Sequence, residues 1–303
     1  MNRKFIFFIN PIAGTKNKER LINYINLKCV ENKLIFEILF TDEKGEYYFL
    51  KDKIRSENIT DVIICGGDGT INHIVKHLIG VDINVGIIPV GSGNGLALAA
   101  GIKTDYKKSI DVILKGYSDW IDGFYVNNHF SCMLSGLGFD AFVANAFLRK
   151  KRRGLFTYIL ICLRYFFISK SYPFEISFDH QKLQTNAFFI SIANSNQFGN
   201  YVKIAPKAKL NDGLLDIIIV TKKNKIMVAM LLLKQILFGT IQREKDVLHK
   251  NKNLYYFQVP QLKIKNPMLA PIHIDGEPIN TEEFVSIKIQ SKAIKLLQPK
   301  PNV

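Results

Sequence analysis

Residues 66–70, Gly-Gly-Asp-Gly-Thr, are the densest group of residue types in this chain that could do chemistry. They follow an apolar run at 61–65 and precede apolar residues with helical spacing at 71–79. Glycines let the backbone approach an anion and aim N–H groups at it, and a helix N-terminus adds partial positive charge. This context predicts a loop that binds nucleotide phosphates. The chain contains no Walker A pattern, so the loop is not of the P-loop type.

Asp68 needs its own explanation, because a carboxylate inside a phosphate-binding loop repels phosphate. Its presence makes sense if it holds Mg²⁺ or accepts a proton from an attacking hydroxyl group. The alternative is a glycine turn in which Asp68 caps the following helix. We favour the chemical role because a strand precedes the loop and a helix follows it.

Two further loops follow predicted strands in the same way. Residues 89–95 read Pro-Val-Gly-Ser-Gly-Asn-Gly, and residues 10–14 read Asn-Pro-Ile-Ala-Gly. Each is a weak signal alone. Strand ends that are neighbours in a parallel sheet can build one nucleotide cleft between their loops, so we expect these loops to act with residues 66–70.

The elements that must position these loops alternate between strand and helix. Strands are expected at 4–9, 34–40, 61–65 and 85–88, and helical segments at 18–28, 45–55, 71–79 and 96–115. Such alternation predicts a parallel, doubly wound sheet. We therefore expect a Rossmann-like α/β nucleotide-binding domain over residues 1–125.

From Trp120 onward the pattern changes to short β-rich runs separated by turns. The expected strands are 121–126, 129–134, 174–179, 188–193, 215–221, 255–259, 261–264, 272–274 and 284–289. Helical stretches at 141–167 and 226–238 interrupt them. This pattern predicts a second, mainly antiparallel, sandwich-like β domain over residues 126–284 that binds the substrate. The tail at 285–303 is expected to return to the first domain.

The composition is that of a globular protein, with 48% hydrophobic and 22% charged residues. Lys and Arg number 41 against 26 Asp and Glu, which gives a net charge of +15. A field of this sign favours phosphate-rich partners or an anionic membrane surface and does not choose among them.

Cysteine usage and the apolar stretches point to a cytoplasmic protein. The four cysteines form no CxxC pair, so we expect reduced thiols rather than a disulfide framework or zinc site. Apolar stretches at 155–168 and 226–241 contain charged residues and fall short of the roughly 20 apolar residues that a spanning helix needs.

Two weaker features have competing interpretations. His73 and His77 have i, i+4 spacing that could bind a metal, but without an HExxH pattern a pair on a helix surface is favoured. The basic run at 149–153 precedes an aromatic-rich segment at 155–167. Three interpretations of this basic run compete: a solvated helix end, a nuclear-localisation signal, and a membrane-facing edge that attracts anionic head groups.

Taken together, five motifs resemble the diacylglycerol/sphingosine kinase family of lipid kinases. They are Asn-Pro-x-Ala-Gly at 10–14, the loop at 66–72, Gly-Ser-Gly-Asn at 91–94, Asn-Asp-Gly-Leu-Leu-Asp at 211–216 and Asp-Gly-Glu at 275–277. The loop at 66–72 is shared with NAD kinases and phosphofructokinases. The last two motifs make the resemblance specific to lipid kinases.

The resemblance implies roles for individual residues. ATP would be contacted by Asn10, Thr41, Gly66, Gly67, Asp68, Gly69, Thr70, Asn72 and Ser92. A structural Mg²⁺ would be bound by Asp212 with the main-chain oxygens of Lys209 and Leu214. Bacterial diacylglycerol kinases assign the base to the position of Glu277, and the sphingosine kinase branch to that of Asp68. Both residues are expected to be essential, and their roles stay open.

The motif at 94–97, Asn-Gly-Leu-Ala, departs from the Asn-Asp-Phe-Ala of bacterial diacylglycerol kinases towards the sphingosine and ceramide kinase branch. The expected function is therefore an ATP-dependent, peripherally membrane-associated kinase of diacylglycerol or a sphingoid or ceramide-like lipid, giving a phospholipid such as phosphatidate. Its partners would be ATP and a lipid at an anionic membrane surface, with no nucleic acid, and a homodimer is left open.

Two other functions compete with this expectation. The alternative enzyme is an NAD kinase-like kinase of a soluble substrate, which has no need of residues 275–277 or of the basic apolar segment. A non-enzymatic basic module that binds membrane or nucleic acid would explain the charge of +15. It would leave Asp68 unexplained.

Overall fold

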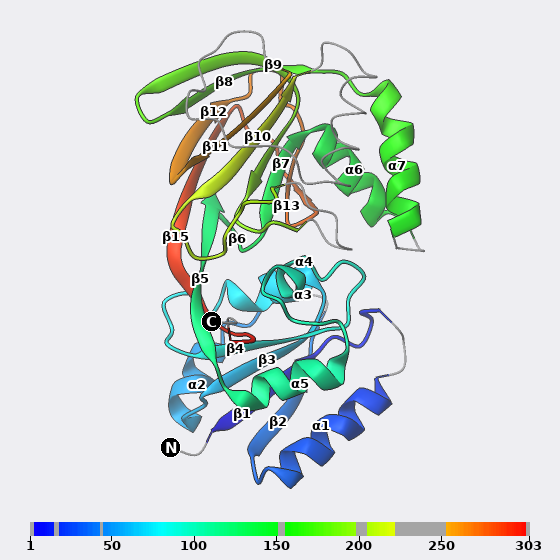
Figure 1. Cartoon of the computed structure of the whole chain (residues 1–303), viewed down its shortest axis with the longest axis vertical. Coiled ribbons are helices and arrows are strands. Elements are labelled where there is room, and N and C mark those ends of the chain that lie inside the picture. The colour runs from blue at the N-terminus through cyan, green and yellow to red at the C-terminus, as the bar shows by residue number, and fades with distance from the viewer. Residues whose placement is uncertain are drawn as a thin grey trace. The chain divides into compact units, whose positions relative to one another are not determined.

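The computed structural model describes residues 3–14, 18–42, 45–150, 155–197, 205–221 and 253–300. The chain divides into two compact units, the first made of residues 1–121 and 292–303 and the second of residues 122–291. Figure 1 shows the helices and strands of both units.

The first unit is built on a parallel sheet. Its strand order is β2 (Ile35–Phe40), β1 (Lys4–Ile9), β3 (Asp61–Gly66) and β4 (Asn84–Pro89). The end of β15 (Phe284–Leu297) adds a parallel neighbour to β4, with Lys295 opposite Asn84. Nearly every residue of β1, β3 and β4 is buried, as expected for strands of a parallel sheet that is covered on both faces.

Helices supply that cover. Buried residues of α1 (Glu19–Glu31) and α5 (Tyr106–Lys115) join one apolar cluster with Phe5, Phe7 and Ile9 of β1. The alternate residue Phe8 contacts Tyr47, just before α2 (Leu50–Glu57), edge to face. A short helix α4 (Gly95–Ala99) follows β4, and α3 (Asp68–Val75) follows β3. The first unit is the doubly wound α/β fold that the sequence predicted.

This strand order contains a topological switch point. From β1 the chain proceeds outward to β2, and it then returns past β1 to form β3. The loops after β1 and β3 therefore diverge, and ligands of open α/β sheets bind in the crevice at such a point. The predicted loops at 10–14 and 66–70 follow these two strands. In chain order, the loops at 10–14, 66–70 and 89–95 are called the first, second and third loops.

The second unit is antiparallel. Its sheet runs β14 (Glu277–Ile279), β13 (Ile272–Ile274), β7 (Leu134–Gly138), β9 (Gln181–Ala193), β8 (Tyr172–Phe178), β12 (Gln261–Lys265) and β15. The other strands are β5 (Ser118–Val126), β6 (His129–Ser131), β10 (Leu215–Thr221) and β11 (Leu254–Val259), with β10 paired to β9 and β11. The helices are α6 (Phe139–Leu148) and α7 (Leu155–Ile168).

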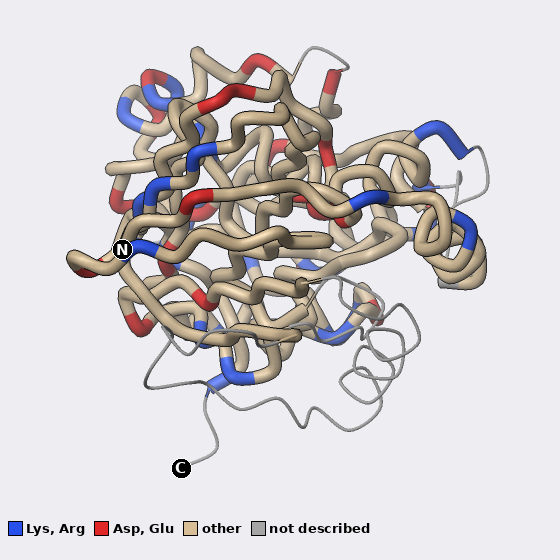
Figure 2. The backbone as a smooth tube through the Cα atoms, turned by 90° about the horizontal axis from the view of Figure 1, so that it is seen from above, with Lys and Arg blue, Asp and Glu red and all other residues tan. Residues whose placement is uncertain are grey.

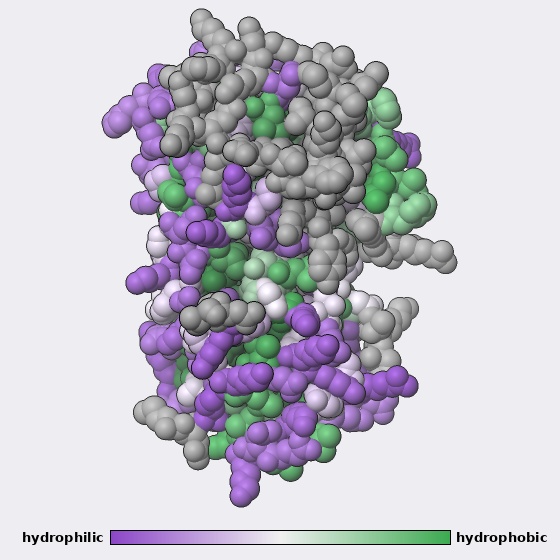
Figure 3. All heavy atoms as spheres, viewed as in Figure 1, coloured by the Kyte–Doolittle hydropathy of each residue, from purple (hydrophilic) through white to green (hydrophobic). Residues whose placement is uncertain are grey.

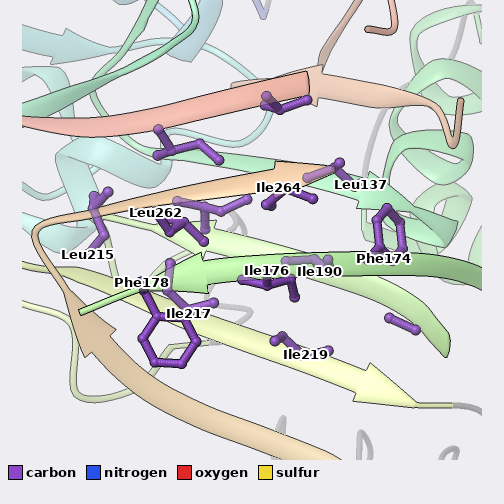
Figure 4. Close-up of a cluster of buried hydrophobic side chains, with 14 of the residues drawn as sticks. Leu137, Phe174, Ile176, Phe178, Ile190, Leu215, Ile217, Ile219, Leu262 and Ile264 are labelled. Atoms are coloured by element: carbon purple, nitrogen blue, oxygen red, sulfur yellow. The ribbon is translucent and has the colours of Figure 1, made fainter. Parts of the chain in front are cut away.

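Strands of this unit enclose one apolar core. In β8 and β12 every second residue is buried and the residues between are partly or fully exposed, so one face of each strand points inward. Figure 4 shows side chains of β7, β8, β9, β10 and β12 that gather in this core, including Leu137, Ile176, Ile190, Ile217 and Ile264. This arrangement confirms the predicted sandwich-like β domain.

Several expected bounds were wrong. The helix expected at 45–55 begins at Leu50, and the one expected at 71–79 covers Asp68–Val75. The helical stretch at 141–167 contains two helices, α6 and α7. Two strands are longer than expected, because β9 begins at Gln181 and β15 continues to Leu297. The helix expected at 226–238 lies outside the described residues.

Candidate functional site

Asn10 connects the first two loops across the switch point. Its backbone N–H donates to the carbonyl of Cys65 at 2.9 Å, and its Nδ2 donates to Oγ1 of Thr70 at 2.7 Å. Its Oδ1 accepts the N–H of Ile12 at 3.0 Å, which shapes the turn after β1. One side chain therefore bonds to both loops.

Glycines bring the loops into direct backbone contact. A Cβ on Gly91 would lie 2.4 Å from the Cα of Gly67. Gly14 has φ of +60°, and a Cβ there would lie 2.0 Å from the carbonyl oxygen of Val90. No side chain fits at these distances, so the close packing of the three loops requires glycine at these positions.

Asp68 joins the second loop to the third. Its Oδ2 accepts the N–H of Gly95 at 3.0 Å and its Oδ1 accepts the N–H of Leu96 at 3.2 Å. These donors are the first N–H groups of α4, which have no partner within that helix. Asp68 is thus a helix cap, but for α4 and not for α3, where it is the first residue.

The environment of Asp68 has two opposing effects on its carboxyl group. Burial raises the pKa because it disfavours the charged form, and this is the larger effect. The N–H groups of Gly95 and Leu96 act against it, because they stabilise the carboxylate. The net result is a pKa above the ordinary value for aspartate.

Asn94 fixes the third loop from within. It adopts left-handed backbone geometry, with φ of 54°. Its Oδ1 accepts the N–H of Gly91 and its Nδ2 donates to the carbonyl of Gly91, both at 2.9 Å. The sequence motif included Asn94, but its role in closing the loop depends on a side-chain conformation that the motif does not specify.

Lys18 is a residue that the sequence interpretation did not select. It is buried, and its Nζ donates to the carbonyl of Ala13 in the first loop. Burial lowers its pKa below the usual value for lysine. The available signal was a lysine directly after a glycine-containing loop and at the start of a helix.

The remaining residues expected to contact ATP lie at the same edge of the parallel sheet. Thr41 follows β2 and donates its N–H to the carbonyl of Ile9 at 3.0 Å. Gly69, Thr70 and Asn72 belong to α3, and Ser92 is exposed on the third loop. This edge of the first unit therefore carries the whole expected nucleotide set.

The expected metal residues surround a turn of the second unit. Oδ1 of Asp212 accepts the N–H of Leu214 at 3.2 Å, and Oδ2 accepts from Nε2 of Gln258 at 3.2 Å. The same Nε2 donates to buried Asp216 at 3.0 Å, and Oδ2 of Asp122 accepts the N–H of Gly213 at 2.8 Å. Asp216 belonged to the sequence motif at 211–216 but was given no role there. Asp122 and Gln258 were not selected from the sequence, because they come close to the turn only through long-range contacts.

A hard cation could bind at this turn only if main-chain carbonyl oxygens served as ligands beside the carboxylate. Within the described ranges, no three acidic, histidine or cysteine side chains converge closely enough to hold a metal ion. Carboxylate and carbonyl oxygens are the ligands that Mg²⁺ and Ca²⁺ take. Asp212 with the carbonyls of Lys209 and Leu214 is a donor set of this kind.

The Asp-Gly-Glu motif is a hairpin turn between β13 and β14. Asp275 and Gly276 have φ of 49° and 87°, as a two-residue type I′ turn requires. Oδ1 of Asp275 accepts from Oγ of Ser131 at 2.7 Å and from the N–H of Leu134 at 3.0 Å. The next residue, Glu277, is exposed. Asp275 thus anchors the turn, and Glu277 extends from it.

His77 packs against the segment that precedes α2. His77 accepts the N–H of Tyr47 at 3.5 Å, and its ring contacts those of Tyr47 and Tyr48 edge to face. Burial lowers the pKa of His77. These contacts give His77 a packing role beside Tyr47 and Tyr48.

Comparisons with known proteins agree with this geometry. Residues 4–126 match the model of the diacylglycerol kinase catalytic domain, and residues 134–298 match that of the YegS C-terminal NAD kinase beta sandwich-like domain. A protein of Salmonella arizonae named "probable lipid kinase YegS" is 31% identical over 252 residues, which are 80% of each chain. The chain belongs to the diacylglycerol kinase-like family of lipid kinases.

Solved structures of this family share the fold. A crystal structure from Bacillus anthracis str. Sterne matches with a TM-score of 0.81 at 19% identity, over 99% of this chain and 98% of the other. A second, of a diacylglycerol kinase from the same organism, matches with a TM-score of 0.72 at 17% identity and the same coverage. These likenesses show the shared fold. The domain matches and the 31% identical relative confirm the predicted lipid kinase family, and the chain is a kinase.

Proposed function

We propose that this lipid kinase transfers the γ-phosphoryl group of ATP to the hydroxyl of a membrane lipid, either diacylglycerol or a sphingoid or ceramide-like lipid. The product would be a phospholipid such as phosphatidate. The observation that carries the proposal is the link that Asp68 makes between two glycine loops at the switch point of the sheet. This link orders backbone N–H groups where a nucleotide binds in such folds.

The carboxylate contacts favour Glu277 as the base that accepts the hydroxyl proton. Both oxygens of Asp68 already accept N–H groups, so Asp68 is suited to organising the nucleotide loops. Glu277 is exposed on the hairpin that Asp275 anchors. A general base must come within hydrogen-bond distance of a substrate proton, and the exposed position of Glu277 makes it accessible to a substrate.

Two roles are proposed for Mg²⁺. When bound with ATP, it would neutralise the charge of the transferred phosphoryl group. A second, structural ion would be held by Asp212 with the main-chain oxygens of Lys209 and Leu214. The carboxylates of Asp122 and Asp216 near the same turn make the local charge favourable for a cation.

We propose that α7 brings the enzyme to its lipid. Phe166 on one side of α7 is buried against Phe139 and Phe188. Six large apolar side chains elsewhere on α7 are exposed: Phe156, Ile159, Leu160, Leu163, Phe167 and Ile168. Figure 3 shows hydrophobic surface over this helix. An exposed apolar patch of this kind marks an interaction surface.

Charge near α7 favours an anionic membrane as the partner. Arg149 and Lys150 are exposed just before the helix, and 151–153 lie outside the described residues. Elsewhere along the described backbone, basic and acidic segments are interspersed (Figure 2). None of the described helices is long and apolar enough to cross a membrane. An apolar helix beside basic residues binds such a surface by lying in the interface.

A labelled-ATP assay tests the proposed function. ATP labelled at the γ-phosphate is incubated with mixed micelles of diacylglycerol, ceramide or sphingosine, and in a parallel reaction with soluble NAD. We expect label in at least one extracted lipid and none in the NAD reaction. Transfer to NAD alone would support the kinase of a soluble substrate. Transfer to no lipid in any micelle would contradict the proposal.

A further inference from the structure

His273 contacts both the Asp-Gly-Glu turn and a helix. It lies on β13 with a side chain that is 1% exposed. Its Nδ1 accepts the backbone N–H of Gly276 at 3.1 Å. On the other side of the ring, Nε2 lies 3.2 Å from Oδ2 of Asp140, in the first turn of α6.

These contacts assign the tautomer of the imidazole. Because Nδ1 accepts a hydrogen bond, it carries no proton, and the ring proton is on Nε2. That proton lies on the side of Asp140, whose side chain is 8% exposed. Neither Nε2 of His273 nor Oδ2 of Asp140 has a hydrogen-bond partner among the described residues, so at 3.2 Å the two atoms face each other as a close polar pair.

The strand opposite His273 leaves space for the pair. Gly136 on β7 is the direct cross-strand partner of His273. A Cβ on Gly136 would lie 2.2 Å from Oδ2 of Asp140 and 2.6 Å from Nε2 of His273. The Asp140–His273 contact therefore requires glycine at 136.

Both central residues of the turn are consequently fixed by side chains. Asp275 is held by Ser131 and Leu134, and the N–H of Gly276 is held by His273. Glu277 is the next residue and pairs with Ile274 across the hairpin. A rotation of the Gly276 peptide would change the direction of Glu277, and the imidazole opposes that rotation.

We infer that His273 is a positioning residue, supported by Asp140, that fixes the Asp275–Gly276 turn and so the direction of Glu277. The inference rests on the proposed function, in which Glu277 accepts the substrate proton. A buried polar pair costs free energy unless its groups are satisfied, and an apolar residue would fill this place in the core without that cost. Positioning of the turn would explain why Asp140 and His273 occupy these buried positions.

Two substitutions at 273 separate the contacts. His273→Asn keeps an acceptor at the position of Nδ1 and loses the Nε2 proton. His273→Gln keeps a donor at the position of Nε2 and loses the acceptor for Gly276. We expect kcat on the lipid to fall at least about tenfold in His273→Gln and less than about fivefold in His273→Asn, with KM for ATP nearly unchanged in both.

Asp140 and Glu277 provide the matched tests. Asp140→Asn retains an oxygen beside the Nε2 proton, so it should keep kcat near the wild-type value, whereas Asp140→Leu removes this polar contact and should lower kcat. In a Glu277→Gln background, His273→Gln should cause no further loss, because its effect acts through Glu277. Equal kcat in the His273→Gln variant and the wild type, or a full further loss in the double variant, would overturn the inference.

A measurement without turnover keeps the inference separate from the proposed function. Nitrogen-15 NMR of the wild-type protein should show an unprotonated Nδ1 and a protonated Nε2 for His273, and slow exchange of the Gly276 amide that is lost in His273→Gln. The opposite tautomer, or an amide equally protected in both proteins, would overturn the positioning role. Absence of lipid phosphorylation by the wild type would instead overturn the proposed function.

Discussion

Oδ2 of Asp68 accepts the backbone N–H of Gly95 at 3.0 Å, so the carboxylate of the second glycine loop caps the helix that follows the third. This contact joins residues that are far apart in the sequence. It lies at the edge of the sheet where Asn10 also bonds to Thr70. The three loops are therefore one connected structure, and a change at Asp68 should affect all of them.

Asp68→Asn should reduce ATP affinity and phosphoryl transfer while the protein stays folded. The amide keeps one acceptor, but its NH₂ group faces the second N–H donor, so one of the two caps is lost. We expect at least a tenfold loss of kcat/KM, that is about 1.4 kcal/mol or more of transition-state stabilisation. The measurement is steady-state transfer with a melting curve for each variant.

The matched control is Asp105→Asn. Asp105 caps α5 by accepting the N–H groups of Lys107 and Lys108, and asparagine is an equally good cap there. This variant should have wild-type kinetics. If Asp68→Asn retains wild-type turnover with a normal melting temperature, Asp68 does not organise the site.

ATP affinity should depend on the protonation of Asp68. Burial raises the pKa of this carboxyl. As the pH is lowered, Asp68 should therefore become protonated, and ATP affinity should fall, at a pH above the ordinary aspartate pKa of about 3.9. Between the unfolded-state pKa and the raised folded-state pKa, folding takes up a proton at Asp68. The contribution of Asp68 to the free energy of unfolding is therefore fully present below the unfolded-state pKa and is lost as the pH rises through the folded-state pKa. Calorimetric ATP titrations at a series of pH values should show this transition, and an identical transition in Asp68→Asn would exclude Asp68 as its source.

Gly91→Ala should weaken ATP binding, because its Cβ would lie 2.4 Å from the Cα of Gly67 and force the second and third loops apart. The control is Gly80→Ala, where φ is +78° but no atom lies within 4 Å of the added Cβ. The control should cost roughly 1 kcal/mol of stability through backbone strain and leave ATP affinity unchanged. Similar ATP affinities for Gly91→Ala and the wild type would show that the loops do not need this contact.

Arg3→Met should lower the free energy of unfolding by roughly 3 kcal/mol, because it leaves the fully buried carboxylate of Asp61 without its guanidinium partner. In the native protein, Nη2 of Arg3 lies 2.6 Å from Oδ1 of Asp61. The control Lys4→Met removes a partly exposed pair with Glu57 and should cost much less, because solvent screens such a pair. Urea unfolding measures both values, and equal losses would contradict this account.

Vesicle binding should depend on α7. The double variant Phe156→Ser, Leu163→Ser should bind anionic vesicles more weakly, and binding of the wild type should fall as salt shortens the Debye length from about 10 Å at 0.1 M to about 3 Å at 1 M. Ile35→Ser with Phe40→Ser, two exposed apolar residues of β2, is the control. Vesicle sedimentation measures the binding, and equal losses in the two double variants would exclude α7 as the docking element.

The strands of the parallel sheet could be predicted because β1, β3 and β4 are buried on both faces and so form continuous apolar runs. The first part of β9 could not, because 181–186 are mostly polar and become a strand only through pairing with β8. The end of β15 is similar, since Lys295 and Leu296 pair with β4, far away in the sequence. Long-range pairing decides such segments, and local pattern does not report it.

The candidate site was predictable to the level of its motifs. The glycines and the aspartate at 66–70 predicted an anion-binding loop. The hydrogen-bond partner of Asp68 is Gly95, and no local sequence pattern relates these two positions. The exposed Glu277 belonged to a motif, whereas the buried contact of His273 with Asp140 crosses from a strand to a helix. Contacts of this kind depend on the packed fold.

The most direct test of the lipid kinase function follows the position of the label. Wild-type protein and Glu277→Gln are incubated with lipid vesicles and ATP labelled either at the γ- or at the α-phosphate, and the lipid is extracted. We predict that γ-label enters the lipid with the wild type, that α-label stays in the aqueous phase, and that Glu277→Gln transfers neither while still binding ATP. Unlabelled lipid with the wild type, or transfer by Glu277→Gln at the wild-type rate, would contradict the account.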